Sequence, residues 1–531
     1  MDSNSEVVYE EFNKKWKIIS KLVLGDEVGE LIDFKKWLVG TSRTAFVHKS
    51  NFSGKPVHLV LQYYPDNAKF ASIEEIDLNK KYEPLDINEI KDIDSIAEAV
   101  QERVVYTGNM HLGECKYLSE STDVVSSSYI YSSAQVAYSK WIAYSYNLEY
   151  CEYLFGCQNI GTKSSHAIRS TATDAQIRCL ETHTSSNCYD CYYGNSLYNC
   201  NNCMFSFGLR NSSYKVGNLQ LNQEEYGKLK KKLLAEIIDE LKRKKSIPQL
   251  ENFFVAVQPN LEKGKEIIPK SSSPEPTNQE MIEDAFRTTT KIVLGKALSG
   301  LDRYGAWLKR YSRDMRVRNS VLSGERLLIP DYSNLYNYPE NRLVNLQEII
   351  SIGKNITIDK NRLGDLSLKT VGEIINDVAF FSGVENFGVL KNNIESEINV
   401  TCQNFYKSIL NLYSKFGAFN FHAFECEYLF GTYSLRKCKF SIRCYMSADL
   451  TRCFEVDSSR NCSDCYFCHN CENLRESMFC FNVKNLSYAI GNVELPKEKY
   501  MELKKKILGE IVSELEGTND LGMNIFNLVK K

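Results

Sequence analysis

The sequence has little of what would assign a chain to a common functional class. Its 531 residues include only 7 histidines and 11 prolines, and its formal net charge is −2. A chain this close to neutral has no bulk charge that would draw it to nucleic acid or to an anionic lipid surface. No apolar run approaches the roughly 20 residues that a membrane-spanning helix needs. We therefore expect a protein that binds neither nucleic acid nor a membrane.

Signals for export and for common types of catalysis are missing as well. The N-terminal segment, MDSNSEVVYEEFNKKW, lacks the basic start and the apolar stretch of a secretory signal peptide. We find no Gly-rich phosphate-binding loop and no nucleophile elbow. We therefore expect a protein that is not an enzyme and that is cytoplasmic, or part of a virion assembled in the cytoplasm.

Cysteine and tyrosine, by contrast, are abundant. The chain has 18 cysteines and 32 tyrosines, and nearly all of the cysteines fall in two dense tracts, one in each half. In a reducing compartment these cysteines should be thiols or metal ligands rather than disulfides. Their positions are therefore more informative than their number.

The two halves of the chain are similar, as if one unit of about 270 residues occurred twice in tandem. Lys21–Gly25 (KLVLG) returns as Lys291–Gly295 (KIVLG). The strongest match runs from Asn187–Ile238 to Asn461–Val512, where roughly half of the positions are identical. Such agreement along the whole chain predicts a duplication. Between the copies, 247–283 is rich in Pro and Ser near its middle, which predicts a flexible linker.

A pattern with a period of three dominates both cysteine-rich tracts. From Ser127 onward every third residue is small or aliphatic, apart from an irregular insertion around 161–178, and in the second copy the pattern holds from Cys426 to Val483. An α-helix repeats at 3.6 residues and a flat strand at 2, so neither fits. A chain that coils in short segments around a thin interior does fit. We therefore predict a β-solenoid in each copy, with a period of three for inward residues and six overall.

The spacing of the inward residues resembles that of insect antifreeze β-helices, in which Cys, Ser and Ala point inward at every third position of a twelve-residue coil. The resemblance concerns the architecture only, because the outward Thr-x-Thr rows of that family are missing here. Hexapeptide left-handed β-helices are less similar, since their inward residues alternate at gaps of two and four.

An amphipathic helix should close each solenoid. In the first copy Asn222 and Glu225 have the spacing of a capping box, and in the second Pro496 suits a first helical turn. Apolar residues then recur at helical spacing in each copy. The regions before the solenoids are harder to interpret, although Leu22–Leu38 resembles a helix and Val57–Tyr63 a strand.

Together these patterns predict an α+β protein made by tandem duplication. Each copy is a small mixed α/β domain, a Cys/Ser-rich β-solenoid and a C-terminal capping helix. The predicted domains are an α/β domain at 1–123, a solenoid at 124–221, a capping helix at 222–246, the linker at 247–283, a second α/β domain at 284–400, a second solenoid at 401–495, and a capping helix with tail at 496–531.

The sharpest candidates for chemistry are two groups of four cysteines with CxxC spacing: Cys188, Cys191, Cys200 and Cys203 in the first copy, and Cys462, Cys465, Cys468 and Cys471 in the second. Taken alone, each resembles a zinc site. However, Cys200 and Cys203 align with Leu474 and Ser477 of the other copy, and a metal ligand cannot exchange with leucine. We therefore favour buried thiols and no cofactor, with a zinc-binding interaction module as the alternative.

A second alternative is a hexapeptide-type solenoid acyltransferase, which would need a histidine as general base. Four histidines lie in or near the tracts, but none aligns with a histidine of the other copy. They are His166, His183, His422 and His469. We therefore assign no catalytic residue.

The tyrosines point to a role in binding other proteins. Tyr138, Tyr144 and Tyr150 recur every six residues between the inward positions, so they should point outward. A row of exposed tyrosines suggests a packing surface for a partner, or for another part of the same chain.

The Asn/Cys/Tyr-rich block from Asn187 through Tyr214 to Glu225-Tyr226 resembles uncharacterised solenoid proteins of phages and small-genome bacteria. This resemblance implies a structural or assembly protein, such as a capsid-associated component of a virion. Its partners would be proteins, through self-assembly or within a larger particle.

Overall fold

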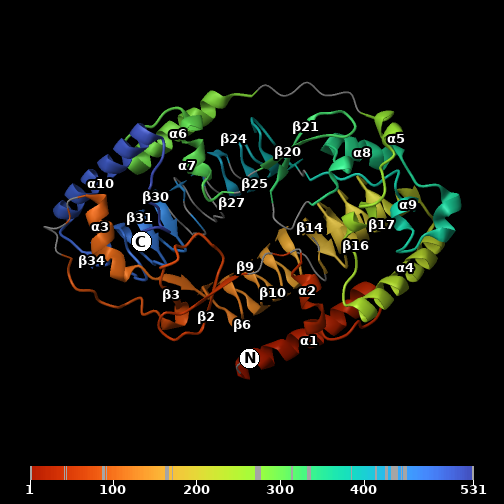
Figure 1. Cartoon of the computed structure of the whole chain (residues 1–531), viewed down its shortest axis with the longest axis horizontal. Helices are drawn as coiled ribbons and strands as arrows, with labels where there is room; N and C mark the ends of the chain where they lie inside the picture. The colour runs from red at the N-terminus through yellow and green to blue at the C-terminus, as the bar shows by residue number, and fades with distance from the viewer. Residues whose placement is uncertain are drawn as a thin grey trace.

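The computed structural model describes most of the chain. The described residues are 3–40, 42, 45–85, 90, 92–161, 167–169, 171–268, 277–312, 315–331, 337–383, 386–412, 415–424, 429–431, 441–443, 445 and 451–528. The chain is mixed α+β, with about as much helix as strand, and most of its strands pair in parallel (Figure 1). Among these described residues, no helix combines the length and apolarity required to cross a membrane.

A stack of parallel strands, here called the first ladder, runs through the first half. Successive strands pair at an offset of twelve residues, as in Lys140 with Glu152. The offset is thirteen where Gln158 pairs with Thr171 and, at the N-terminal end, where His111 pairs with Val124. Its strands are β5 (His111–Leu112), β6 (Lys116–Ser119), β7 (Thr122–Val125), β8 (Ser128–Tyr131), β9 (Ala134–Ala137), β10 (Lys140–Ala143), β11 (Tyr146–Glu149), β12 (Glu152–Phe155), β13 (Gln158–Gly161), β14 (Thr171–Ile177), β15 (Leu180–His183), β16 (Ser186–Asn195), β17 (Asn201–Phe207), β18 (Ser213–Val216) and, antiparallel at the end, β19 (Leu219–Gln220).

A second ladder with the same offset runs through the second half, for example where Phe454 pairs with Tyr466. Its strands are β22 (Asn386–Phe387), β23 (Glu397–Val400), β24 (Phe405–Tyr406), β25 (Ile409–Leu412), β26 (Gly417–Ala418), β27 (Phe421–Phe424), β28 (Leu429–Phe430), β29 (Ser441–Ile442), β30 (Cys453–Asp457), β31 (Ser463–His469), β32 (Arg475–Met478), β33 (Ser487–Ile490) and the antiparallel β34 (Val493–Glu494). Much of the predicted period between Cys426 and Leu450 lies outside the described residues.

The backbone explains why the strands are so short. From Tyr117 to Tyr153 every third residue has a positive φ, between 42° and 60°. This left-handed conformation costs roughly 1–2 kcal/mol for most residues and is easiest for Asn and Asp. In the second ladder, asparagine accordingly occupies many such positions: Asn461, Asn470, Asn473, Asn482 and Asn485. Every second one of these bends lies between two strands, so each strand from β6 to β12 is four residues long.

Buried serines connect one turn of the first ladder to the next. The hydroxyl of Ser133 donates to the carbonyl of Tyr131 at 2.8 Å. The same oxygen accepts the backbone N–H of Ser145, twelve residues on, at 3.1 Å. A residue at such a position must be small, and a hydroxyl there satisfies backbone groups that are cut off from water.

Helices cover the outer sides of the ladders (Figure 1). They are α1 (Ser3–Leu24), α2 (Lys35–Leu38), α3 (Ile93–Val100), α4 (Gln223–Lys244), α5 (Leu261–Lys265), α6 (Gln279–Leu294), α7 (Gly305–Lys309), α8 (Leu346–Asn355), α9 (Val371–Ile374) and α10 (Lys497–Thr518). The capping box predicted at Asn222 and Glu225 is present at the start of α4. The helix expected at Leu22–Leu38 is wrong, because α1 ends at Leu24 and only η1 (Leu31–Phe34) and α2 follow.

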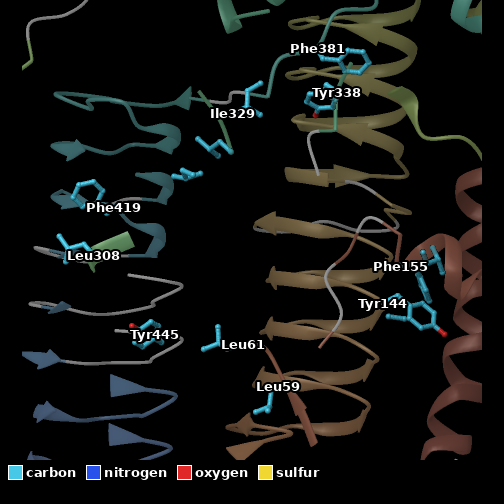
Figure 2. Packing of buried hydrophobic residues seen from close by; sticks show 14 of the residues in the cluster. Leu59, Leu61, Tyr144, Phe155, Leu308, Ile329, Tyr338, Phe381, Phe419 and Tyr445 are labelled. Carbon is cyan, nitrogen blue, oxygen red and sulfur yellow. The ribbon is translucent and has the colours of Figure 1, made fainter. Parts of the chain in front are cut away.

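Short hairpins and paired segments lie between the ladders, namely β1 (Phe46–Lys49), β2 (Pro56–Leu59), β3 (Phe70–Ser72), β4 (Tyr106–Gly108), β20 (Met315–Asn319) and β21 (Arg326–Pro330). Figure 2 shows Leu61 and Ile329 in the space between the ladders. One buried hydrophobic cluster extends over both halves of the chain, whereas the ladder interiors form separate clusters.

The two halves exchange segments reciprocally. The backbone N–H of Thr107, in β4, donates to Nε2 of His469 in the second ladder at 2.9 Å. The backbone N–H of Ser382 donates to Oδ1 of Asn195 in the first ladder at 3.1 Å. An aromatic ring next to Thr107 also contacts the other half, because Tyr106 packs on Phe481 with ring centroids 6.0 Å apart.

The covering helices take part in the same exchange. The N–H of Ile93, at the start of α3, donates to Glu510 of α10 at 2.9 Å. The N–H of Leu368, just before α9, donates to Glu236 of α4 at 2.8 Å. Each half therefore completes the environment of the other half's ladder and helix.

Candidate functional site

The eight cysteines of the two CxxC groups are all buried inside the ladders. Cys191 pairs in register with Cys203 of the next strand, so the side chains stack in a column. Each thiol donates to a nearby carbonyl, as Cys191 does to Tyr189 at 3.4 Å and Cys465 to Ser463 at 3.4 Å. The thiols therefore fill the interior and satisfy backbone acceptors.

The environment keeps most of these thiols neutral, whereas hydrogen bonds from neighbouring thiols lower the pKa of Cys200 to about 3 and also lower the pKa of Cys462. Burial raises the pKa values of Cys191, Cys465 and Cys480 well above the usual range. A neutral thiol is a weak nucleophile and a poor metal ligand. Within the described part of the chain, no group of three or more His, Cys, Asp or Glu side chains is placed to hold a metal ion. Cys426, Cys438 and Cys444 lie outside the described residues.

We expect thiol chemistry to report this burial. In dilute native protein Cys115, the one half-buried cysteine among the described residues, should react with a maleimide about 100-fold faster than the cysteines of the CxxC groups. After denaturation all 18 cysteines should titrate as free thiols, and elemental analysis should find no stoichiometric zinc. Peptide mapping identifies the fast site, and a Cys115→Ser variant is the control. One zinc ion per chain would contradict this prediction.

Two of the four candidate histidines are described, and both are buried. The ring of His469 uses both nitrogens: Nδ1 lies 2.8 Å from Asp457, and Nε2 accepts the N–H of Thr107. Its role is therefore to join the two halves. His166 and the side chain of His422 lie outside the described residues.

His183 lies in a buried charged cluster in the first half. Its Nε2 is 3.6 Å from Glu181, and its Nδ1 is 3.9 Å from Glu251. Burial lowers the pKa of His183, but the carboxylates of Glu181 and Glu251 outweigh burial and raise the pKa overall. This arrangement stabilises an imidazolium ion and contains no nucleophile, so it does not resemble a catalytic base.

Sequence reasoning missed a pair of buried ion pairs in equivalent places. In the first half Arg169 lies 3.1 Å from Glu181, and in the second Arg443 lies 3.3 Å from Glu455. All four side chains are at most 3% exposed. Their positions differ by the offset that aligns the two halves. Each arginine therefore aligns with an arginine and each glutamate with a glutamate, and this match could have pointed to the pairs from the sequence.

A tryptophan covers each of these arginines. The guanidinium of Arg169 lies 5.0 Å from the ring of Trp37, and that of Arg443 lies 5.4 Å from the ring of Trp307. A guanidinium stacks well on an indole face, which compensates part of its lost hydration.

Two of the three candidate tyrosines form an exposed pair. The rings of Tyr138 and Tyr150 stack with centroids 5.0 Å apart and an interplanar angle of 11°. Their exposed fractions are 47% and 48%. They stand at the same turn of successive coils, because twelve residues separate them.

The exposure predicted for Tyr144 is wrong, since this side chain is fully buried. Its ring packs on Tyr131, and its carbonyl accepts the hydroxyl of Ser42 at 2.7 Å. The reason is the coil length. Residues six apart lie on opposite turns of a twelve-residue coil, and the turn that carries Tyr144 faces the region of α1 and α2.

Two other aromatic stacks with the same spacing are more deeply buried. Tyr129 and Trp141 stack at 3.8 Å, and Lys15 of α1 lies 4.9 Å above Trp141. Tyr193 and Phe205 stack at 4.9 Å and are fully buried. The pair of Tyr138 and Tyr150 differs because both rings remain largely open to solvent.

Comparisons with known proteins assign no relative to this chain: no family model, no curated protein and no solved structure matches it. Its function must therefore be inferred from the geometry of its own residues.

Proposed function

We propose that this chain is a rigid, non-enzymatic scaffold for protein–protein contacts, built from two β-solenoids that arose by tandem duplication. The solenoid proposal is supported by the recurring offset of twelve residues and by the small buried side chains at every third position. A ladder of this kind is held by many short-range contacts and resists bending. The domain boundaries given above stay predictions.

The duplication is supported by contacts that recur at one offset. Glu236 and Glu510 are 274 residues apart, and each caps a segment from the other half. The buried pairs of Arg169 and Arg443 with their glutamates differ by the same number. Two independently evolved halves would have no reason to share both contacts.

The observation that carries the functional proposal is the exposed stack of Tyr138 and Tyr150. Tyrosine buries a large ring at low cost in side-chain entropy, and it is enriched where proteins bind one another. Mutual stacking fixes these two rings before a partner arrives. A fixed aromatic surface on a rigid support is suited to docking another protein.

The setting that we propose is a phage particle or its assembly, following the resemblance of the Asn/Cys/Tyr-rich block. Many proteins of such particles contribute binding surfaces rather than catalysis. The near-neutral net charge of −2 and the buried, neutral thiols are compatible with this role.

Replacing both tyrosines tests the proposal. In cells that produce the particles, the tagged chain should co-sediment with them. The double variant Tyr138→Ser/Tyr150→Ser should reduce incorporation of the chain into particles at least about tenfold, because hot-spot tyrosines dominate interfaces. Tyr189→Ser is the matched control, since Tyr189 is 47% exposed and belongs to the same ladder. The proposal would be overturned if the wild-type chain sedimented as a free protein rather than with particles. It would also be overturned if the double variant were incorporated as well as the wild type.

A further inference from the structure

The first ladder has one closed end and one open end. At its C-terminal end β19 folds back on β18 and is followed by α4. The second ladder closes in the same way, with β34 on β33 followed by α10. At the N-terminal end of the first ladder, β5 pairs with β7 and β6 with β8, and neither has another partner among the described strands.

The open end exposes both backbone and apolar interior. Gly113, Glu114, Lys116 and Tyr117 are exposed, and Tyr117 is 49% accessible. One face of its ring stacks on Tyr129 with centroids 4.5 Å apart. Cys115 and Leu118, which begin the apolar interior cluster, are only half-buried. An edge of this kind is a template for strand addition unless its side chains prevent it.

We propose that a second copy of this chain docks on this open end in a head-to-head dimer. The segment Leu112-Gly113-Glu114-Cys115-Lys116-Tyr117-Leu118 is complementary to itself when two copies run antiparallel about Cys115. Glu114 then faces Lys116 of the other copy, and Leu112 faces Leu118. Tyr117 then faces Gly113 of the other copy.

Charge decides between a second copy and an arbitrary foreign strand. Charged residues on an edge normally prevent pairing, because most partners leave them unmatched. In the self-paired arrangement both charges of each copy meet an opposite charge. Neither Glu114 nor Lys116 forms a salt bridge with any other described residue, so both are available.

Symmetry also favours this arrangement. A twofold axis through the turn at Cys115 exchanges β5 with β6 of the other copy, which makes the interface isologous and closed. The dimer covers the half-buried Cys115 and Leu118 and continues the ladder through the interface. This inference rests on the proposed assembly role and names one partner for it.

Charge exchange tests the proposal on the full chain. Light scattering with size-exclusion chromatography should find a dimer at micromolar concentration. Lys116→Glu places like charges opposite one another at two symmetric sites and should weaken the dimer about tenfold or more. The double variant Glu114→Lys/Lys116→Glu exchanges the charges and should restore the dimer. Lys140→Glu, at an exposed lysine on β10 of the same sheet, is the matched control and should have no effect.

Reactivity of Cys115 gives a second readout, because its labelling rate should fall as the protein concentration passes through the dimerisation range. A monomeric wild type at tens of micromolar, or a dimer that Lys116→Glu leaves intact, would overturn the proposal. The variant Tyr138→Ser/Tyr150→Ser should remain dimeric. The tyrosine variant therefore tests the tyrosine surface, because it should lose particle incorporation while the dimer stays intact. The Lys116→Glu variant tests the open end, because it should lose the dimer.

Discussion

Replacing Glu455 by glutamine should lower the free energy of unfolding by about 3–5 kcal/mol, the usual cost of removing one partner of a buried ion pair. Glutamine keeps the size of the side chain and can still accept the N–H of Ile525, which lies 3.0 Å from Oε2 of Glu455. The substitution therefore removes little besides the charge. Urea unfolding followed by tryptophan fluorescence measures the change.

The expected loss is large because Arg443 cannot adapt. A guanidinium stays protonated in proteins, and no hydrogen-bond partner of the Arg443 side chain is present among the described residues. Without Glu455 a cation would remain fully buried and unpaired. The additional substitution Arg443→Met should recover much of the loss, because replacing both charges leaves no unpaired ion.

A pair whose arginine is open to solvent provides the control. Arg452 and Asp464 lie 2.6 Å apart on the same ladder, but the arginine is 46% exposed. Asp464→Asn should therefore cost about 1 kcal/mol or less. Glu181→Gln, at the equivalent buried pair of the first half, should behave like Glu455→Gln. A loss below about 1 kcal/mol at Glu455 would contradict the importance assigned to these pairs.

The period of three identified the buried positions of the ladders, because only small or apolar side chains fit inside so narrow a coil. The same pattern could not predict that Tyr144 is buried. It identifies the residues that point inward, but it does not show which of the two outer sides of the coil is covered by a helix. That choice depends on α1, whose apolar residues recur at helical spacing among many charges. Val8, Phe12, Trp16, Ile19 and Val23 of α1 are buried in the structure.

The buried charges and the exchange of segments were harder to predict. Arg169 and Arg443 look like ordinary surface residues until their alignment and their tryptophans are considered together. Tyr106 and Phe381 occupy matching places in similar halves. The sequence therefore does not show whether each ring packs on the ladder of its own half or on the ladder of the other half. Chain geometry makes that choice, and similar residues satisfy both arrangements.

Cutting the predicted linker (247–283) between the halves should leave them bound to each other. A protease site inserted within 269–276 allows the folded chain to be cleaved into two fragments. Because each fragment supplies contacts that the other lacks, both should elute together from a size-exclusion column at the position of the intact chain. Separation should require denaturant.

The contacts that hold the fragments together lie far from the cut. Tyr106 donates its hydroxyl to the carbonyl of Ile525 at 2.8 Å and is buried by the second half. Phe381 packs against Phe207 with ring centroids 5.5 Å apart. Replacing a buried aromatic side chain by alanine costs about 3–5 kcal/mol of folding free energy. In the cut chain the same loss weakens the association of the two fragments.

The decisive comparison is therefore between cut and uncut forms of one variant. Tyr106→Ala/Phe381→Ala should remain a single species while the linker is intact, because the halves are then tethered at a high effective concentration. After cleavage the same variant should separate into fragments, whereas the cut wild type should not. Immediate separation of the cut wild type would show that the linker, rather than the reciprocal exchange of segments, holds the two halves together.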